Sequence, residues 1–354
     1  MPPQTLPASP APGENQIQKI VSHCNSYREA STSQALLQLA TTTTGFVALL
    51  STMVFAFNHG VYWLDMLLLL PAAGFLVRLF IIQHDCGHNS FFPSRKANNA
   101  LGRVIAILTF TPYDFWRRAH NLHHAHSGNL GKRGLGSIDT LTVAEYQALS
   151  PFRRFLYRSF RNPLVVLFIG PPVQTFIIQR FPPAQTVAYL EDYHPMSVAE
   201  TWKSLMLFNL ALLVCYGVAV ALLGWKVLVL VYLPVVVVTS WLGGWLFYIQ
   251  HQFENTWWNR GKAWTFEEAA LYGSSYYALP NILQWFSGNI GLHHIHHLCA
   301  KIPNYRLQEC MDALPELSTI NRMTLRDSLK CVFWALWDEN KRKMVTFRDL
   351  QAAV

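Results

Sequence analysis

Apolar side chains gather in four long runs along the chain, at residues 35–57, 61–82, 204–223 and 227–249. Each run comes close to the roughly 20 apolar residues that a helix needs to cross the hydrocarbon core of a bilayer. Backbone groups inside a bilayer must bond within their own segment, so we expect each run to be a transmembrane helix. Only three residues separate the first run from the second and the third from the fourth, which predicts two helical hairpins.

A fifth apolar run, residues 163–181, has a different pattern. Gly170-Pro171-Pro172 interrupts it, and Arg161 and Arg180 flank it. Proline lacks a backbone donor and clashes with the preceding helical turn. We therefore predict that this run lies at the membrane interface or re-enters the bilayer from one side, and that it does not cross.

Composition and charge agree with a membrane protein. Hydrophobic residues make up 51% of the chain and charged residues 14%, whereas soluble domains carry about a quarter charged residues. The net charge is +8, and Lys and Arg concentrate between the two hairpins, with Lys226 alone in the short turns. Positive loops stay in the cytoplasm, so both termini and the central segment should be cytoplasmic. No basic helix interleaved with stacking aromatics suggests nucleic acid as a partner.

The two ends of the chain differ from its centre. The first 14 residues are rich in proline and are expected to be disordered. We divide the chain into a disordered and amphipathic segment 1–34, a membrane domain 35–310 and a cytoplasmic, helical C-terminal segment 311–354. The six cysteines form no CxxC pair, which argues against a disulfide framework or a zinc ribbon.

Eight of the 14 histidines lie in three short clusters. The clusters are an HxxxH and two HxxHH patterns, made of His84 and His88; of His120, His123 and His124; and of His293, His296 and His297. On a helix, residues i, i+3 and i+4 share a face, with Cβ atoms about 5–6 Å apart. Two such imidazoles can chelate one ion while the third reaches a neighbouring ion, and neutral imidazole binds Fe, Zn or Cu.

The predicted topology allows all three clusters to meet. The first cluster follows the second run, and the second cluster stays on the same side. The third and fourth runs return the chain to that side before the third cluster. If residues 163–181 also crossed the bilayer, the second and third clusters would lie on opposite sides. We therefore expect one metal centre at the cytoplasmic membrane surface.

The phrases HDCGH, HNLHH and GLHHIHH, in this order around two helical hairpins, resemble the membrane fatty acid desaturases over about residues 35–310. HHAHSGNLGKRG, FYIQHQFENTWW and GNIGLHHIHHLCAKIPNYRLQEC are most similar to bacterial acyl-lipid desaturases of the Δ5, Δ12 and ω6 group. The resemblance implies an all-α integral membrane fold in the bacterial inner membrane. Four transmembrane helices in two hairpins would lie under a cytoplasmic helical cap that holds a histidine di-iron site.

The resemblance also implies which histidines bind the metal. The implied ligands are His84, His88, His120, His123, His124, His251, His293, His296 and His297. His251 is isolated, directly after the fourth run. Some relatives add an Asn one turn before this histidine, but here Phe247 occupies that position, and Asn289 is an alternative candidate.

Other residues are expected to support the site or to lie outside it. His294 falls off the ligand face, so we expect solvent or a supporting contact, and His126 is a further supporting candidate. His23, His59 and His194 are expected at the surface. Carboxylates commonly orient metal-binding imidazoles, and the candidates are Asp85, Asp114, Asp139 and Glu254.

The implied reaction is the O₂-dependent insertion of a cis double bond into a lipid-linked acyl chain, with two Fe ions as cofactor and O₂ as co-substrate. The chain has neither a GxGxxG fingerprint nor an HPGG haem motif, so electrons must come from a separate protein. A basic cytoplasmic face suits an acidic ferredoxin served by its reductase. Lys132, Arg133 and Lys341 are candidate docking residues.

Two other functions remain open at this point. A hydroxylase or carotenoid ketolase of the same di-iron superfamily would have the same histidine spacing. A membrane metal transporter usually binds its ion near the bilayer midplane, on the spans themselves. The four apolar runs contain no histidine, which disfavours transport.

Overall fold

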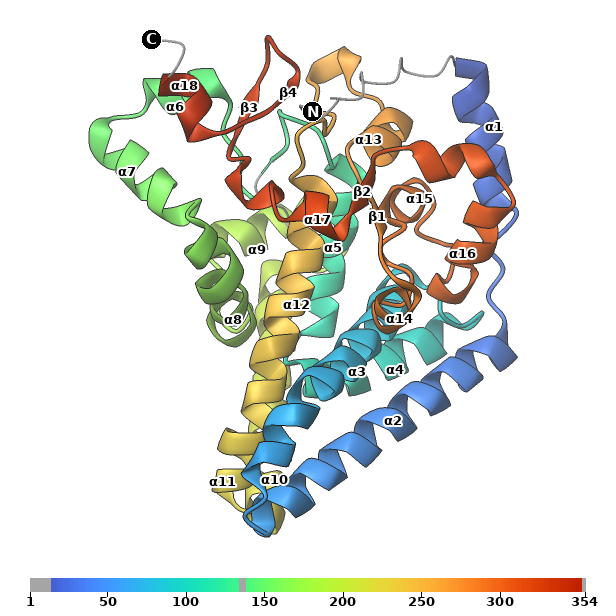
Figure 1. The fold of residues 1–354 in the computed structure, drawn as a ribbon, viewed down its shortest axis with the longest axis vertical. Helices are drawn as coiled ribbons and strands as arrows, with labels where there is room; N and C mark the ends of the chain where they lie inside the picture. Colours follow the sequence, from blue (N-terminus) through green and yellow to red (C-terminus); the bar gives the residue numbers. More distant parts are fainter. Residues whose placement is uncertain (1–13, 134–137, 352–354) are drawn as a thin grey trace.

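A computed structural model describes residues 14–133 and 138–351 of the chain. The disorder predicted for the start of the chain therefore falls outside the described residues. Long helices form one end of the molecule, and shorter helices and strands form a cap at the other end (Figure 1). The ligand-bearing helices lie where the two parts meet.

Within the described residues, four helical segments are long and apolar enough to cross a membrane, which confirms the four predicted spans. They are α2 (Thr32–Asn58), α3 (Tyr62–His88), α10 (Val198–Leu223) and a segment from Trp225 to His251 that consists of α11 (Trp225–Val227), η3 (Leu228–Tyr232) and α12 (Leu233–His251). Ser197 and Glu200 form a capping box that starts α10. Gly224 takes a φ of 84° in the turn to α11, a conformation that favours glycine.

The second and fourth spans extend further than the hydrophobic pattern predicts. α3 continues through His84 to His88, and α12 continues through Ile249 to His251. These polar ends are buried by the cap rather than hydrated, so the helices do not stop where the apolar runs stop. Three predicted ligands thus lie on the span helices.

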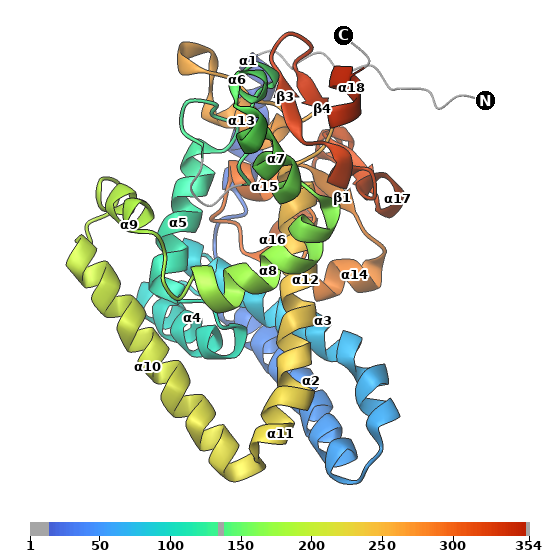
Figure 2. The same cartoon turned by 90° about the vertical axis from the view of Figure 1, so that its left-hand side faces the viewer.

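α3 is the central span, because it packs against α2, α4 (Arg95–Thr109) and α12. Figure 2 shows that α10 diverges from α12 beyond the α11 turn. The apolar side chains of α10 are largely exposed, with Leu213 at 71% and Leu222 at 78%. Such an apolar surface is what lipid tails cover.

The fifth apolar run is helical from residue 163 to residue 178. It consists of η1 (Val165–Ile169), α8 (Gly170–Val173) and η2 (Gln174–Ile178), and it is bent by 56° from α7 (Pro151–Phe160). The prolines do not end the helix as expected, because they occupy the first positions of α8 and π-helical turns flank them. The bend fits a broken span or a re-entrant segment, and the interfacial placement stays a prediction.

The remaining elements are short. The helices are α1 (Glu14–Asn25), α5 (Tyr113–His126), α6 (Val143–Ala148), α9 (Ala184–Glu191), α13 (Phe266–Tyr272), α14 (Asn281–Phe286), α15 (His293–Leu298), α16 (Asn304–Asp312), α17 (Leu325–Ser328) and α18 (Phe347–Gln351). Three 3-10 turns are η4 (Gly261–Ala263), η5 (Pro315–Thr319) and η6 (Cys331–Phe333). β1 (Tyr276–Ala278) pairs in parallel with β2 (Arg322–Thr324), and β3 (Leu336–Asp338) pairs antiparallel with β4 (Lys343–Val345).

The C-terminal segment 311–354 was expected to be helical, and its described part is mixed instead. It contains β2, β3 and β4 beside short helices. β3 and β4 form hydrogen bonds with residues outside the C-terminal segment. The Trp337 amide donates to the Leu141 carbonyl at 3.0 Å, and the Met344 amide donates to the Glu254 carbonyl at 2.8 Å. These partners are remote in sequence, so no local pattern announces the strands. The three-part division of the chain stays a prediction.

Candidate metal centre

Four helices bring the predicted histidines together. α3 carries His84 and His88 in its last turns, and α12 ends at His251. α5 carries the second cluster, and α15 carries the third. The HxxxH and HxxHH patterns therefore all lie on helices, as the spacing predicts.

The first group contains five buried histidines, and one ligand atom from each lies within 4.8 Å of the others. Its members are His84, His88, His120, His124 and His296. The Nε2 atoms of His120 and His124 are 3.1 Å apart, and those of His124 and His296 are 3.2 Å apart. The ring nitrogens thus converge on one small volume that can hold a metal ion.

The second group is centred on His251. One ligand atom from each of His123, His251 and His297 lies within 4.8 Å of the other two. The Nε2 atom of His251 lies 3.1 Å from the Nε2 atoms of both His123 and His293. The rings of His293 and His297 are in edge-to-face contact, with centroids 4.5 Å apart, so His293 belongs to the same group.

The position of each histidine along its helix determines which of the two groups its imidazole joins. On α5, His120 and His124 join the first group, and His123 joins the second. On α15, His293 and His297 lie in the second group, while His296 joins the first. Each HxxHH helix therefore contributes an i, i+4 pair to one group and its third histidine to the other.

Burial keeps these histidines neutral. Burial, followed by the neighbouring imidazoles, holds the pKa of His123, His124 and His296 well below the usual range. The same causes lower the pKa of His120, His293 and His297. Neutral imidazoles retain the lone pair that binds a metal, and metal affinity falls when ligands are protonated.

The donor set fits a metal. Several buried ring nitrogens, among them His84 Nε2, His88 Nε2 and His297 Nε2, have no hydrogen-bond partner among the described residues. Buried polar atoms are normally paired, so a cluster of unpaired imidazoles needs an explanation. Nitrogen ligands of this kind suit Fe, Zn or Cu.

Asp85 is the candidate carboxylate that contacts a predicted ligand. Its Oδ1 atom lies 3.2 Å from His84 Nδ1. Its Oδ2 atom accepts from the backbone amide of Asn304 at 2.7 Å and from the Asn304 side chain at 2.8 Å. The other candidates lie elsewhere: Asp114 pairs with Arg103, Glu254 pairs with Lys343, and Asp139 is exposed.

Three other residues complete the surroundings of the site. His294 was expected to contact solvent or a neighbouring group, and it is fully buried with Nε2 3.1 Å from the Leu317 carbonyl oxygen. Asn289 donates its side-chain amide to the Asn304 carbonyl at 3.0 Å. The centroid of the Phe247 ring lies 5.3 Å from that of His123 and 5.5 Å from that of His251.

The remaining histidines lie outside both groups. His126 is half-buried, and its Nδ1 atom is 2.7 Å from the Ala125 carbonyl oxygen. His59 is exposed. His23 and His194 are half-buried rather than exposed, and His23 Nε2 lies 2.9 Å from the Cys310 carbonyl oxygen.

Trp116 contacts the site and was not singled out from the sequence. Its ring stacks on the His120 imidazole, with centroids 4.7 Å apart and planes 13° apart. Gly87, next to His88, leaves room for it, because a Cβ atom there would lie 3.0 Å from Trp116 Cζ3. The glycine of HDCGH and the tryptophan four residues before His120 were the available signals.

We predict that Trp116 and Gly87 act as one unit in orienting His120. Trp116→Ala should lower the affinity of the metal-free protein for Co²⁺ by about tenfold, within the range typical of residues that support a ligand. Gly87→Ala should cause a smaller loss, because the added methyl group displaces the indole. This loss should vanish in the Trp116→Ala background, as a double-mutant cycle measures.

A suitable control for this cycle is Gly243→Ala. A Cβ at Gly243 meets no atom within 4 Å, so the affinity should not change. Fully additive losses from Trp116→Ala and Gly87→Ala would contradict the prediction, because the glycine would then act through another contact.

Comparisons with known proteins agree with the site. A sequence model described as fatty acid desaturase matches residues 31–327. A fatty acid desaturase of Bacillus subtilis (strain 168) is 37% identical over 327 residues, which cover 92% of this chain and 89% of that protein. An sn-1 acyl-lipid omega-3 desaturase (ferredoxin) of Synechocystis is 27% identical over 299 residues, covering 83% and 77%.

A plant protein is also similar to this chain. An endoplasmic reticulum omega-3 fatty acid desaturase of Vigna radiata var. radiata is 28% identical over 275 residues, which cover 74% of this chain and 67% of that protein. Residues 31–327, which the family model matches, include both groups of histidines. The chain therefore belongs to the fatty acid desaturase family.

Proposed function

We propose that this protein inserts a cis double bond into the acyl chain of a membrane lipid, with O₂ as co-substrate and two iron ions as cofactor. The observation that carries the proposal is the pair of buried histidine groups, which share the helices α5 and α15. The hydroxylase and ketolase alternatives lose support, because the matched relatives are desaturases.

We assign one iron to each group. His84, His88, His120, His124 and His296 would hold the first ion, and His123, His251, His293 and His297 would hold the second. A saturated acyl chain offers no acidic proton, and a bound di-iron centre supplies with O₂ the oxidant that its C–H bonds require. The protein itself must orient the chain and keep the site dry.

The residues around the histidines suit these tasks. Asp85 fixes the orientation of His84 through Nδ1, and Trp116 and Phe247 cover the rings of His120 and His123. Such contacts exclude water from the site and hold the imidazole planes. α3 and α12 are both candidate spans that end at the site, which supports a substrate chain that reaches it from the membrane.

The partners and the location are proposed on the same basis. Two cyanobacterial relatives are named as acyl-lipid desaturases that use ferredoxin, so we propose a lipid-linked substrate and a ferredoxin-like donor served by its reductase. The excess of Lys and Arg between the hairpins supports a site on the cytoplasmic side. The Bacillus relative supports a bacterial membrane protein, and we propose the cytoplasmic (inner) membrane as its location.

Metal analysis and product analysis test the proposal together. Protein purified without O₂ from iron-replete cells should contain close to two irons per chain. Expression in a host with known saturated lipids should yield new cis double bonds. His123→Ala and His296→Ala, one from each group, should yield none. A single stoichiometric zinc, or a hydroxylated product without a double bond, would rule the proposal out.

A further inference from the structure

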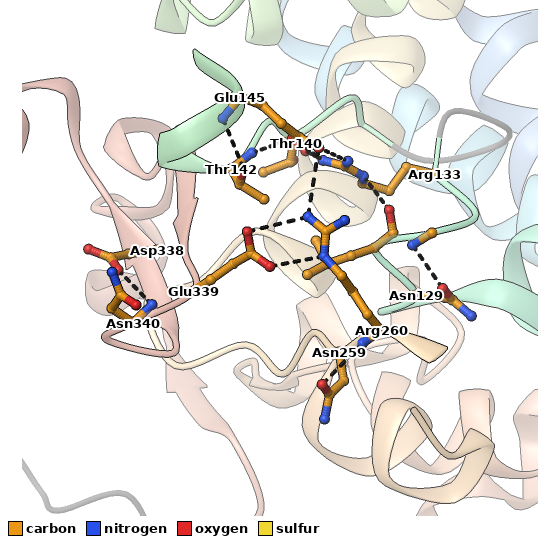
Figure 3. Close-up of polar contacts among 12 residues, drawn as sticks. Asn129, Arg133, Thr140, Thr142, Glu145, Asn259, Arg260, Asp338, Glu339 and Asn340 are labelled. Atoms are coloured by element: carbon orange, nitrogen blue, oxygen red, sulfur yellow. Dashed lines mark hydrogen bonds and ion pairs between the residues drawn. The ribbon is translucent and has the colours of Figure 1, made fainter. Parts of the chain in front are cut away.

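Four basic side chains on the side of the cap near β3 and β4 pair with carboxylates. Arg133 pairs with Glu145 at 2.5 Å, and Arg260 pairs with Glu339 at 2.9 Å. Figure 3 shows both guanidinium groups pointing toward these carboxylates. Lys343 also pairs with Glu254 at 2.9 Å, and Lys341 with Asp338 at 3.7 Å. Lys262 and Arg342 on the same side form no ion pair among the described residues, so these pairs reduce the free positive charge of this surface without removing it.

A second group of basic side chains is different. Arg28, Arg95, Lys96 and Lys301 are all exposed. Among the described residues, none of the four forms an ion pair with a carboxylate, in contrast to the pairs near β3 and β4. We call these four residues the Lys301 patch. One exposed carboxylate, Glu29, lies in the same loop as Arg28, so the patch keeps a clear positive excess.

Folding brings the patch together from three segments that are remote in sequence. Tyr305 joins them, because its hydroxyl accepts from the Ser31 amide at 2.9 Å and donates to the Phe91 carbonyl at 3.0 Å. Arg306 adds a contact to the Glu29 carbonyl at 3.3 Å. The loop before α2, the loop between α3 and α4, and the start of α16 therefore lie side by side.

Three cations of the patch, Lys301, Arg28 and Arg95, are close enough to affect one another. The pKa of Lys301 is lowered, first by partial burial and then by the positive charges of Arg28 and Arg95. Like charges held together without a counter-charge cost stability. Such a local conflict is typical of a functional surface.

The patch also touches the metal centre. The Lys301 ammonium donates to the backbone carbonyl of His88 at 2.6 Å. The imidazole of the same residue belongs to the first histidine group. One residue therefore connects the exposed patch with the site proposed to bind iron.

The proposed reaction requires electrons from outside. Oxidation of one CH₂–CH₂ unit to CH=CH releases two electrons and two protons, while reduction of O₂ to two waters consumes four of each. Two electrons and two protons per turnover must therefore be supplied. The described chain buries its histidines in the protein, so a protein donor has to dock on the surface close to them.

We propose that the Lys301 patch is the docking surface for an acidic electron-carrier protein. This inference rests on the proposed desaturase function. The patch combines uncompensated positive charge with direct contact to His88, and an acidic carrier complements it. Of the docking residues that the sequence suggested, Arg133 and Lys341 have carboxylate partners, and Lys132 has none among the described residues. The proposal places docking at the Lys301 patch instead, because Lys301 contacts His88.

A charge-reversal experiment tests the proposal without turnover. The protein is placed in nanodiscs of phosphatidylcholine, and its association with an acidic [2Fe–2S] ferredoxin is followed by stopped flow at low and physiological salt. The double variant Arg28→Glu/Arg95→Glu should associate at least about tenfold more slowly at low salt, because the attraction that steers the encounter is lost. Its salt dependence should also shrink.

The matched control makes the same change of charge on the other surface. Lys262 and Lys341 are exposed, and Lys262→Glu/Lys341→Glu should leave the association rate within about twofold of the parent value at physiological salt. Both double variants should keep their iron. The proposal is wrong if Arg28→Glu/Arg95→Glu associates as fast as the parent, or if the control is slowed equally.

A lipid phosphate is the competing occupant, since α2 begins at Thr32, four residues after Arg28. Nanodiscs that contain phosphatidylglycerol test it by native mass spectrometry. Loss of retained phosphatidylglycerol in Arg28→Glu/Arg95→Glu, together with an unchanged ferredoxin association rate, would overturn the docking proposal and assign the patch to phosphate. The proposed desaturase function is tested separately, by measuring iron content and lipid products. A negative result there is therefore distinguishable from a negative result in the docking experiment.

Discussion

His251→Ala is expected to abolish desaturation and to empty the second metal position. The Nε2 atom of His251 lies 3.1 Å from those of His123 and His293, so its loss leaves the second group without its central nitrogen. Loss of a direct ligand should cost more than the 10–100-fold that removal of a supporting residue costs. Iron content should fall toward about one per chain, and lipid analysis should detect no new double bonds.

Two further variants serve as controls for His251→Ala. His124→Ala removes a member of the first group and should be equally inactive. His194→Ala changes a half-buried histidine outside both groups and should keep iron and activity. If His251→Ala retained full iron and normal desaturation, another residue would have to close the second group, and His126 would be the next to test.

The four spans were predictable because their apolar runs are long and uninterrupted. Their polar ends were not, since His84 and His251 continue the helices into a buried environment that the cap provides. The hydrophobic pattern of the sequence does not indicate which polar residues are buried by segments that are remote in sequence. The prolines at Pro171 and Pro172 were expected to interrupt a helix, but the helix continues through them with π-helical turns on either side.

The clustered histidines were predictable because i, i+3 and i+4 spacing places them on one helical face. The partition between the groups follows from the same geometry, as His120 and His124 show beside His123. His251 has no neighbour that signals its role, so the family resemblance was needed to propose it. Its contacts with His123 and His293 span 128 and 42 residues.

Contacts between remote segments account for what the sequence did not predict. Trp116 is positioned by Gly87 of another helix, and β3 and β4 are held by Leu141 and Glu254. The charge state of the surface is a similar case. Composition predicts a basic cytoplasmic face, but only the fold reveals which cations have carboxylate partners, as Arg133 does.

Asp85→Asn is expected to weaken metal binding at the first group, with little change in side-chain size. With Asp85 Oδ1 next to His84 Nδ1 at 3.2 Å, the proton lies on Nδ1, and Nε2 keeps the lone pair that a metal needs. An asparagine that keeps its oxygen toward the two donors of Asn304 presents its NH₂ group to His84. The proton of the neutral ring then moves to Nε2, which can no longer bind.

The opposite orientation of the asparagine also carries a cost. It would keep an oxygen near His84, but its NH₂ group would face the backbone and side-chain donors of Asn304, and buried donors left without acceptors are destabilising. Either orientation should lower the affinity of the metal-free protein for Co²⁺ by about 10–100-fold at one of its two positions. Asp114→Asn, the same change in a carboxylate that pairs with Arg103, should leave both affinities intact. Two unchanged affinities in Asp85→Asn would show that His84 does not depend on this carboxylate for its tautomer.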